Sequence, residues 1–98
     1  MKITVTTFEE SAREIRAVRD AVFGREQKVA RELDWDGKDA QCVQVLATDE
    51  NGAPIGTGRL EPDGKIGRMA VVKEWRGRGV GRAMLETLLE CAREQDFF

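Results

Sequence analysis

The 98-residue sequence contains neither histidine nor tyrosine, and these two absences exclude whole classes of site. Without histidine the chain cannot build a serine–histidine triad, a His-ligated zinc site or an imidazole acid–base pair, and without tyrosine it has no phenol acid. The chain also lacks any apolar run near the roughly 20 residues that a membrane span requires. Its opening segment, MKITVTTFEE, has no hydrophobic region typical of a signal peptide.

An excess of one charge is missing as well. Lys+Arg 16 and Asp+Glu 18 leave a net charge of −2, which argues against nucleic acid and anionic membranes as partners. The two cysteines, Cys42 and Cys91, are too few for a disulfide scaffold, and we expect buried thiols in a reducing cytoplasm. The composition therefore predicts a single cytoplasmic domain over residues 1–98.

Hydrophobic periodicity predicts the element order β-α-α-β-β-β-α. Alternation indicates a short strand at 2–6, and Thr7-Phe8-Glu9-Glu10 fits a capping box that begins a helix. We expect Gly24 to end or break that helix. A second amphipathic stretch at 27–33 directs Val29 and Leu33 to the core and leads into an acidic loop.

The second half of the chain predicts an antiparallel meander followed by a helix. Turn sequences separate three β-forming segments, at 42–48, 54–60 and 65–72. The glycine-rich run RGRGVG then begins a helix that reaches about residue 95.

The RGRGVG run lies where a strand enters a helix, an arrangement that favours anion binding. First-turn N–H groups of a helix have no intrahelical partners, and the helix dipole adds partial positive charge there. Glycines let the backbone approach an anion closely, and arginines pair with phosphate oxygens. The alternative is a glycine-rich turn with solvated arginines, but glycines alternating with arginines at this position favour the anion site. The residues concerned are Arg76, Gly77, Arg78, Gly79, Val80, Gly81 and Arg82.

Two familiar phosphate motifs fit this run poorly. A Walker loop requires Lys-Ser/Thr after its last glycine, whereas Arg82-Ala83 follow here. The dinucleotide fingerprint requires wider glycine spacing and an acidic residue on a later strand, which this chain does not provide.

The longer segment MAVVKEWRGRGVGRAML resembles the acyl-coenzyme A motif of the GNAT superfamily of N-acetyltransferases. Arg76, Gly79 and Gly81 fill its core pattern, Gln/Arg-x-x-Gly-x-Gly/Ala. The stretch RDAVFGREQKVARELDWDGKD further resembles a bacterial subgroup of that superfamily. The resemblance implies an α/β (α+β) acyl-CoA N-acyltransferase fold, in which helices flank a mixed, mainly antiparallel sheet. It also implies that the C-terminal part of that fold is missing, with its return strand and its tyrosine general acid.

The resemblance further implies acetyl-CoA as the cosubstrate. The backbone of Met69, Ala70 and Val71 would pair with the pantetheine arm, and the run from Arg76 to Arg82 would hold the pyrophosphate. A strand edge opened by a bulge exposes N–H groups that can polarise a thioester carbonyl. The implied reaction is direct attack by a primary amine, of a small molecule or a peptide, in a ternary complex. No metal is expected.

The amine must be deprotonated before it attacks, so the implied chemistry needs a carboxylate base, acting directly or through water. Glu61, at the end of the strand before the motif strand, is the first candidate, and Glu26 is the second. For each, a solvated turn carboxylate is the alternative. For the whole chain, the alternative is a non-catalytic CoA-binding or oligomerising remnant of such a domain.

The acidic loop allows two interpretations. Trp35, amid Asp34, Asp36 and Asp39, either lines an acceptor site that attracts a cationic amine or covers the core beside a solvated loop. The spacing of these acids does not match a calcium loop.

We also expect a homo-oligomer. An unpaired strand edge templates association, and Phe97 and Phe98 place two apolar side chains at a terminus.

Overall fold

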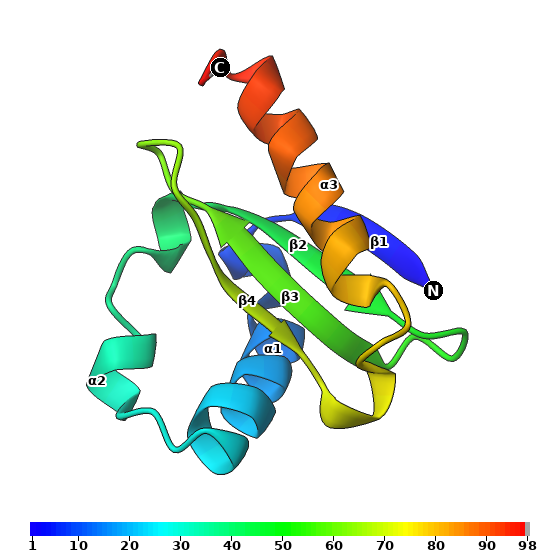
Figure 1. Ribbon diagram of the computed structural model, residues 1–98. Coiled ribbons are helices and arrows are strands. Elements are labelled where there is room, and N and C mark those ends of the chain that lie inside the picture. Colours follow the sequence, from blue (N-terminus) through cyan, green and yellow to red (C-terminus); the bar gives the residue numbers. More distant parts are fainter. Residues whose placement is uncertain (98) are drawn as a thin grey trace.

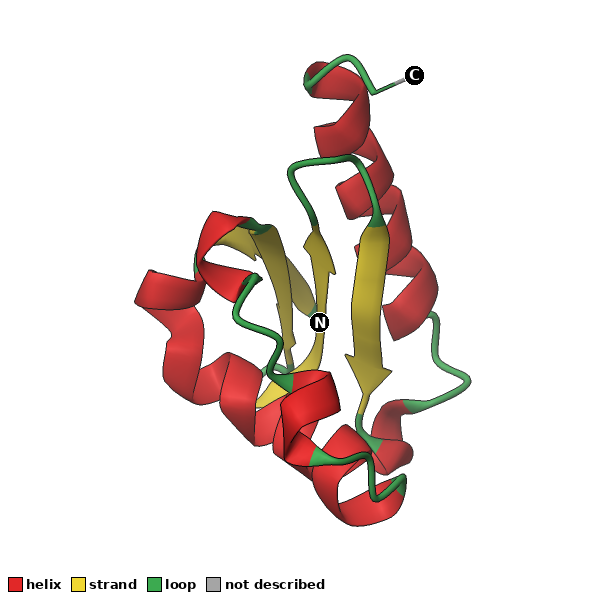
Figure 2. Cartoon of the chain, turned by 90° about the vertical axis from the view of Figure 1, so that its left-hand side faces the viewer, coloured by secondary structure: helices red, strands yellow, loops and turns green. Residues whose placement is uncertain are grey.

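The computed structural model describes residues 1–97, except for the side chain of Glu32, and forms an antiparallel sheet with helices on both faces (Figures 1 and 2). The strands lie in the order β1-β2-β3-β4. The elements are β1 (Lys2–Thr6), α1 (Phe8–Arg19), η1 (Asp20–Glu26), α2 (Arg31–Asp34), η2 (Asp39–Gln41), β2 (Val43–Thr48), β3 (Pro54–Leu60), β4 (Ile66–Val71), η3 (Lys73–Trp75) and α3 (Val80–Glu94). The predicted order of strands and helices and the α/β fold class are confirmed.

Helix α1 begins as the capping sequence predicts, since Thr7 Oγ1 accepts a hydrogen bond of 3.1 Å from the Glu10 N–H. Its predicted end at Gly24 is wrong. The α-helix ends at Arg19, and the chain continues through Gly24 as the π-helix η1. Val22 of η1 packs with Ala70 of β4, and the Gln27 N–H donates to the Val22 carbonyl at 2.8 Å, so helical hydrogen bonding continues past the glycine.

The second predicted helix is shorter than expected. Helix α2 covers only Arg31–Asp34, and Lys28 has a φ of 55° in the irregular segment before it. Leu33 does not reach the core, because 69% of its surface is exposed. Arg68 of β4 instead holds the end of α2, donating from Nη2 to the carbonyl of Leu33 at 2.7 Å and from Nε to that of Asp34 at 3.1 Å.

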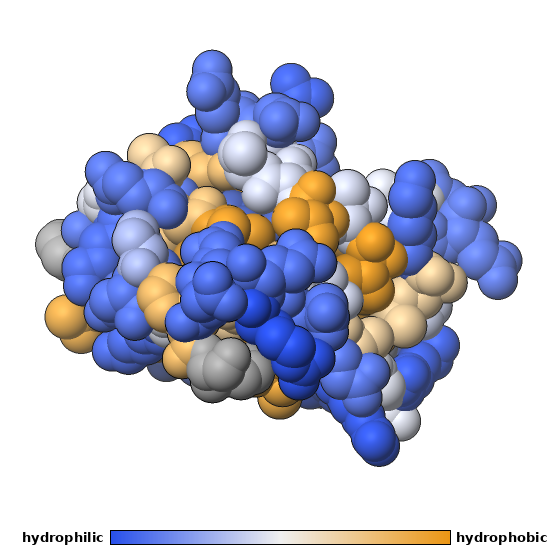
Figure 3. All heavy atoms as spheres, turned by 90° about the horizontal axis from the view of Figure 1, so that it is seen from above, coloured by the Kyte–Doolittle hydropathy of each residue, from blue (hydrophilic) through white to orange (hydrophobic). Residues whose placement is uncertain are grey.

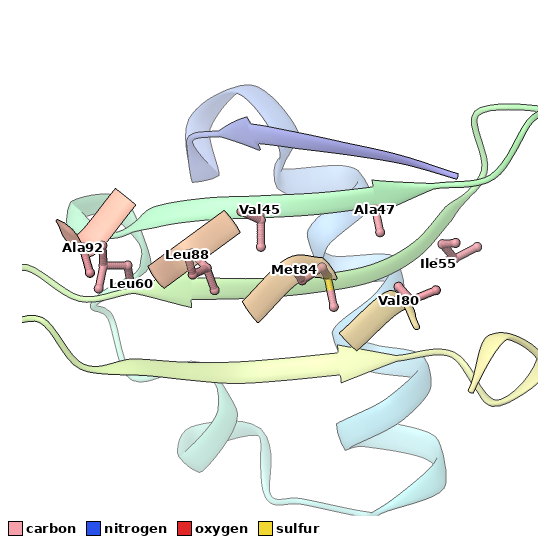
Figure 4. Packing of buried hydrophobic residues seen from close by; sticks show 8 residues of the cluster. All are labelled: Val45, Ala47, Ile55, Leu60, Val80, Met84, Leu88 and Ala92. Atoms are coloured by element: carbon pink, nitrogen blue, oxygen red, sulfur yellow. The ribbon is translucent and has the colours of Figure 1, made fainter. Parts of the chain in front are cut away.

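Helix α3 covers one face of the sheet, and α1 with η1 covers the other (Figure 2). The main core lies under α3 (Figure 4) and consists of Val45, Ala47, Ile55, Leu60, Val80, Met84, Leu88 and Ala92. Gly56 of β3 allows this close packing, since a Cβ there would lie 3.0 Å from Met84 Cε. A smaller core under α1 and η1 contains Val18, Val22 and Ala70.

Helix α3 ends in a Schellman-type turn. Asp96 has a φ of 61°, and the Phe97 N–H donates to the Ala92 carbonyl at 3.0 Å. The Phe97 ring lies against Gly64 in the β3–β4 hairpin, so this side chain is partly covered within the chain. Phe98, the other residue of the predicted apolar terminus, lies outside the described residues.

Figure 3 views this end of the molecule, where hydrophilic side chains dominate and apolar atoms fill the gaps between them. Among the described residues, no helix combines the length and apolar character needed to cross a membrane.

Candidate active site

Strand β4 has one edge paired with β3 and one edge that no described strand covers. The register between the two strands shifts between Thr57 and Arg59, opposite Arg68, whose φ is 50°. This irregularity is a β-bulge in β4. A bulge bends a strand and interrupts its ladder, so β4 turns its edge outward next to Met69.

The hydrogen-bond pattern shows which groups of β4 face that outer edge. Val72 donates to the Ile55 carbonyl at 2.9 Å, and bonded and non-bonded positions alternate along an antiparallel ladder. Val71 therefore directs its N–H and C=O away from β3. Its carbonyl accepts a bond of 3.0 Å from Arg76 Nε, which confirms this orientation. The Val71 N–H has no partner among residues 1–97 and is free to donate to a ligand along the edge.

The glycine-rich turn links β4 to α3. Gly77 and Gly79 have φ values of 76° and 83°, a region that favours glycine, and Gly79 is the N-cap of α3. The first bond into the helix runs from the Ala83 N–H to the Gly79 carbonyl. The N–H groups of Val80, Gly81 and Arg82 consequently lack partners in the described chain.

The surface around this turn is open. A Cβ placed on Gly77 or Gly79 would meet no atom within 4 Å, and one on Gly81 would approach only Val71 Cγ2, at 3.8 Å. No acidic residue lies in the first turn of α3. Exposed N–H groups, the positive end of a helix dipole and open space together fit a phosphate group.

The arginines of the turn are all engaged by other residues. Arg76 donates from its two Nη atoms to the Glu26 carboxylate, at 2.5 and 2.7 Å. Arg78 stacks over the Trp75 ring, with its Cζ 4.8 Å from the ring centroid, and Arg82 pairs with Glu86 on the exposed face of α3. The glycine-rich turn therefore offers free backbone N–H groups, while its arginine side chains contact other residues of the chain.

The two predicted base candidates lie apart from each other. The hydrogen bond from Arg76 lowers the pKa of the Glu26 carboxyl, and the same contact raises the pKa of Arg76. Glu61 lies in the β3–β4 hairpin, at the opposite end of β4 from the glycine-rich turn. It is buried, 3.4 Å from Arg59 Nη2 and 3.6 Å from Lys38 Nζ.

Two buried arginines on the face of the sheet that α1 covers form an ionic network that the sequence analysis did not predict. Arg19 and Arg59 are each 1% exposed. Arg19 donates to Asp34 Oδ1 from Nε and Nη2 and to Asp39 Oδ1 from Nη1, at 2.7 to 2.9 Å. Arg59 donates to Asp36 Oδ2 at 2.6 Å and to Asp39 Oδ1 at 3.0 Å. Its bond to Asp36 lowers the pKa of that carboxyl.

Trp35 belongs to this buried cluster. The Arg19 Cζ lies 3.9 Å from the centroid of its ring, and the Phe8 ring meets it edge-on, with 5.9 Å between centroids. Trp35 is thus a partly buried packing residue, as the second interpretation predicted, but the loop beside it is not solvated, because Asp34 and Asp39 are buried.

A cavity of about 270 Å³ lies between the η1–α2 segment and the bulge of β4. It is lined by Phe23, Gln27, Val29, Leu33, Asp34, Arg68 and Met69. Met69 belongs to the stretch of β4 that the family resemblance assigned to the cosubstrate. The cavity therefore borders the strand edge at the bulge.

Comparison with known proteins gives consistent matches. The family model described as Acetyltransferase (GNAT) family matches residues 7–97. The chain is 33% identical to the Bacillus subtilis protein YyaT over 101 residues, which span 97% of this chain and 68% of YyaT. It is 30% identical to the uncharacterized N-acetyltransferase YjcF of the same organism over 97 residues, 96% of this chain and 69% of YjcF.

Solved structures match the same fold. The crystal structure of a proposed N-acetyltransferase from Lactobacillus plantarum superposes with a TM-score of 0.84 at 32% identity, covering 98% of this chain and 69% of that one. Escherichia coli ElaA superposes with a TM-score of 0.79 at 23% identity, covering 95% of this chain and 70% of ElaA. The sheet and helices described above are those of the acyl-CoA N-acyltransferase fold.

Proposed function

Because the chain belongs to the GNAT acetyltransferase family, we propose that it transfers an acetyl group from acetyl-CoA to a primary amine, by direct attack with both substrates bound. Family membership supports transferase activity with an acyl-CoA in general. The choice of acetyl-CoA, the amine acceptor and the residues assigned to each role are part of the proposal.

One observation supports this function most directly. The N–H groups at the start of α3 lack partners in the described chain, and they lie beside the edge of β4 on which the Val71 N–H also points away from β3. Val80, Gly81 and Arg82 would hold the pyrophosphate through their amides. Met69, Ala70 and Val71 would bind the pantetheine arm as a neighbouring strand does. Such donors stabilise negative charge that develops on a carbonyl oxygen during acyl transfer.

Within this arrangement, the bound thioester supplies the activated acetyl group and the chain supplies position and charge stabilisation. Arg76 links the glycine-rich turn to η1 through Glu26 and to β4 through the Val71 carbonyl. Glu61 and Glu26 stay predictions as the base. For Glu26, accepting a proton would require its pair with Arg76 to open.

The test is coenzyme A binding to the glycine-rich turn, measured by calorimetry. In Gly79→Val, a bulky side chain occupies the open space that the pyrophosphate needs, and we expect binding to be lost. Gly37→Val is the matched control, because Gly37 has a φ of 80° and no atom within 4 Å of an added Cβ. Both variants carry the same backbone strain, of about 1–2 kcal/mol, but only one alters the proposed site. Equal affinity in wild type and Gly79→Val would show that the site is wrong.

Acetyl transfer distinguishes an enzyme from a binding module. Wild-type chain, acetyl-CoA and a panel of primary amines should release coenzyme A only in the presence of an amine. Coenzyme A binding without transfer to any amine would favour the non-catalytic alternative.

A further inference from the structure

A second cavity lies between α1 and the segment that runs from α2 to η2. Its volume is about 370 Å³, and it shares no lining residue with the cavity beside β4. None of its described lining residues belongs to a strand, so it is also separate from the edge of β4 and from the glycine-rich turn. The lining residues that decide its chemistry are Phe8, Arg16, Arg31, Trp35, Asp39 and Ala40.

Two arginines of this cavity have no acidic partner among the described groups. Arg16 lies on α1 and Arg31 is the first residue of α2, and both are exposed. The Arg16 Cζ lies 5.4 Å from the centroid of the Phe8 ring, which holds the guanidinium at the cavity wall. Within residues 1–97, neither guanidinium donates a hydrogen bond to another side chain or to the backbone. Both can therefore donate to a ligand in the cavity.

The acidic residue in the wall does not cancel these two charges. Asp39 is 5% exposed, and its Oδ1 accepts hydrogen bonds from Arg19 Nη1 at 2.7 Å and from Arg59 Nη1 at 3.0 Å. Its charge is thus already balanced within the buried ionic network. Arg16 and Arg31 leave the cavity with an excess of positive charge, and guanidinium groups bind carboxylates through paired N–H donors.

Aromatic side chains form another part of the wall. Phe8 and Trp35 are half-buried and meet edge-on, with 5.9 Å between ring centroids. The buried Arg19 packs on the Trp35 ring at 3.9 Å from its centroid, so the ring is held in place before any ligand binds. A fixed aromatic surface suits a planar ring. The volume of about 370 Å³ corresponds to roughly twelve water volumes, which accommodates a ligand of about ten non-hydrogen atoms.

We propose that this cavity binds a small aromatic carboxylate, with its ring against Phe8 and Trp35 and its carboxylate between Arg16 and Arg31. A single negative charge fits better than a phosphate dianion, because the Asp39 carboxylate lies in the same wall and repels a second charge. Such a ligand would be distinct from the acyl-CoA and from the amine. The proposal does not depend on the proposed function.

The first experiment measures binding of phenylacetate and of phenylacetamide to the full chain by NMR titration at pH 7. The two probes share their shape and differ in charge. Exposed ion pairs contribute modestly, so we expect phenylacetate to bind about 3- to 30-fold more tightly. The indole N–H resonance of Trp35, identified with the variant Trp75→Phe, should shift on binding. Equal affinity for the two probes, or an unshifted Trp35 resonance, would overturn the proposal.

A double variant tests the two arginines. Arg16→Gln/Arg31→Gln should bring the affinities of the two probes together, and it leaves packing intact because both side chains are exposed. Arg13→Gln/Arg25→Gln is the matched control, since it removes the same charge from exposed positions that do not line this cavity. The control should keep the preference for phenylacetate. An undiminished preference in Arg16→Gln/Arg31→Gln would place the anion elsewhere.

Ala40 allows a test that leaves both arginines in place. It lines the cavity and is exposed, so charges introduced there do not disturb the core. Ala40→Glu should weaken phenylacetate binding by about two- to fivefold, and Ala40→Lys should strengthen it by a similar factor. Binding of phenylacetamide should be the same in both. If the two variants bind phenylacetate equally, the site is wrong, and if phenyl phosphate binds the wild type more tightly than phenylacetate, the ligand class is wrong.

Coenzyme A separates this proposal from the proposed function. Saturating coenzyme A, and the variant Gly79→Val, should leave the affinity for phenylacetate unchanged. Displacement of phenylacetate by coenzyme A would place it at β4 and overturn the proposal. Binding of phenylacetate in this cavity by a chain that does not bind coenzyme A would support it and refute the proposed function alone.

Discussion

Replacing Arg19 with methionine should destabilise the domain far more than the loss of one hydrogen bond. The guanidinium is 1% exposed and serves two buried carboxylates, Asp34 and Asp39. Methionine fills a similar volume and keeps the apolar contact with Trp35, so the main change is electrostatic. Asp39 keeps Arg59 at 3.0 Å, but the nearest remaining cation to Asp34 is Arg68 Nε, at 3.8 Å from Oδ1.

The expected loss of stability follows from the carboxylate that Arg19→Met leaves without a close cation. Removing one partner of a buried ion pair leaves an uncompensated charge and costs about 3–5 kcal/mol. A domain of this length has a total stability of about 5–15 kcal/mol, so Arg19→Met should lose a large fraction of it. The melting temperature should fall by at least 10 °C, at about 4–8 °C per kcal/mol.

Urea denaturation followed by circular dichroism measures this loss. Arg82→Met is the control, because the Arg82–Glu86 pair is exposed and such helical pairs contribute about 0.3–0.5 kcal/mol. The double variant Arg19→Met/Asp34→Asn should be more stable than Arg19→Met alone, since it removes the stranded charge as well. If Arg19→Met costs no more than the control, or if the double variant shows no recovery, the network does not hold this face of the fold together.

Three further predictions concern acid, the thiols and assembly. The hydrogen bond from Arg59 lowers the pKa of Asp36 below its unfolded value of about 3.9. The stability that the ionised Asp36 contributes is therefore fully present above that pH and is lost as the pH falls below it. Between pH 5 and pH 3 the urea midpoint should fall more in wild type than in Asp36→Asn. Burial raises the pKa of Cys42 and Cys91, so both should react slowly with a thiol reagent in the native state, and an acetylated cysteine detected by mass spectrometry without acceptor would contradict direct transfer. The unpaired edge of β4 predicts a dimer or higher oligomer in sedimentation equilibrium, and a strict monomer at high concentration would refute it.

The features that the sequence predicted correctly are local. Examples are the Thr7 cap, the three strands of the meander and the glycine-rich turn. Each is encoded within a few consecutive residues, because capping and turn residues favour one local backbone conformation. Gly24 failed as a helix end for the opposite reason. Glycine is common after helices, but here the segment around it packs through Val22 on Ala70, which lies far along the chain, and a local sequence pattern does not reveal such a contact.

The ionic network could not be predicted in this way, although part of its signal is visible. Arg19 follows Ile15 by four residues, so it shares the buried face of α1, and a buried arginine requires acidic partners. The acidic loop supplies them, but the pairing of Arg59 with Asp36 joins residues 23 positions apart and depends on how β3 lies against that loop.

This contrast separates the two halves of the candidate site. The half proposed to bind the cosubstrate is made of backbone groups in one continuous segment, from Met69 to Arg82, so its sequence motif and its geometry coincide. The cavity beside β4 is instead made of side chains from η1, from the segment that follows it, from α2 and from β4, and Arg68 of β4 holds the end of α2 in place. A sequence motif can therefore reveal the glycine-rich turn, whereas the cavity depends on contacts such as that of Arg68 with the Leu33 carbonyl, which joins residues 35 positions apart.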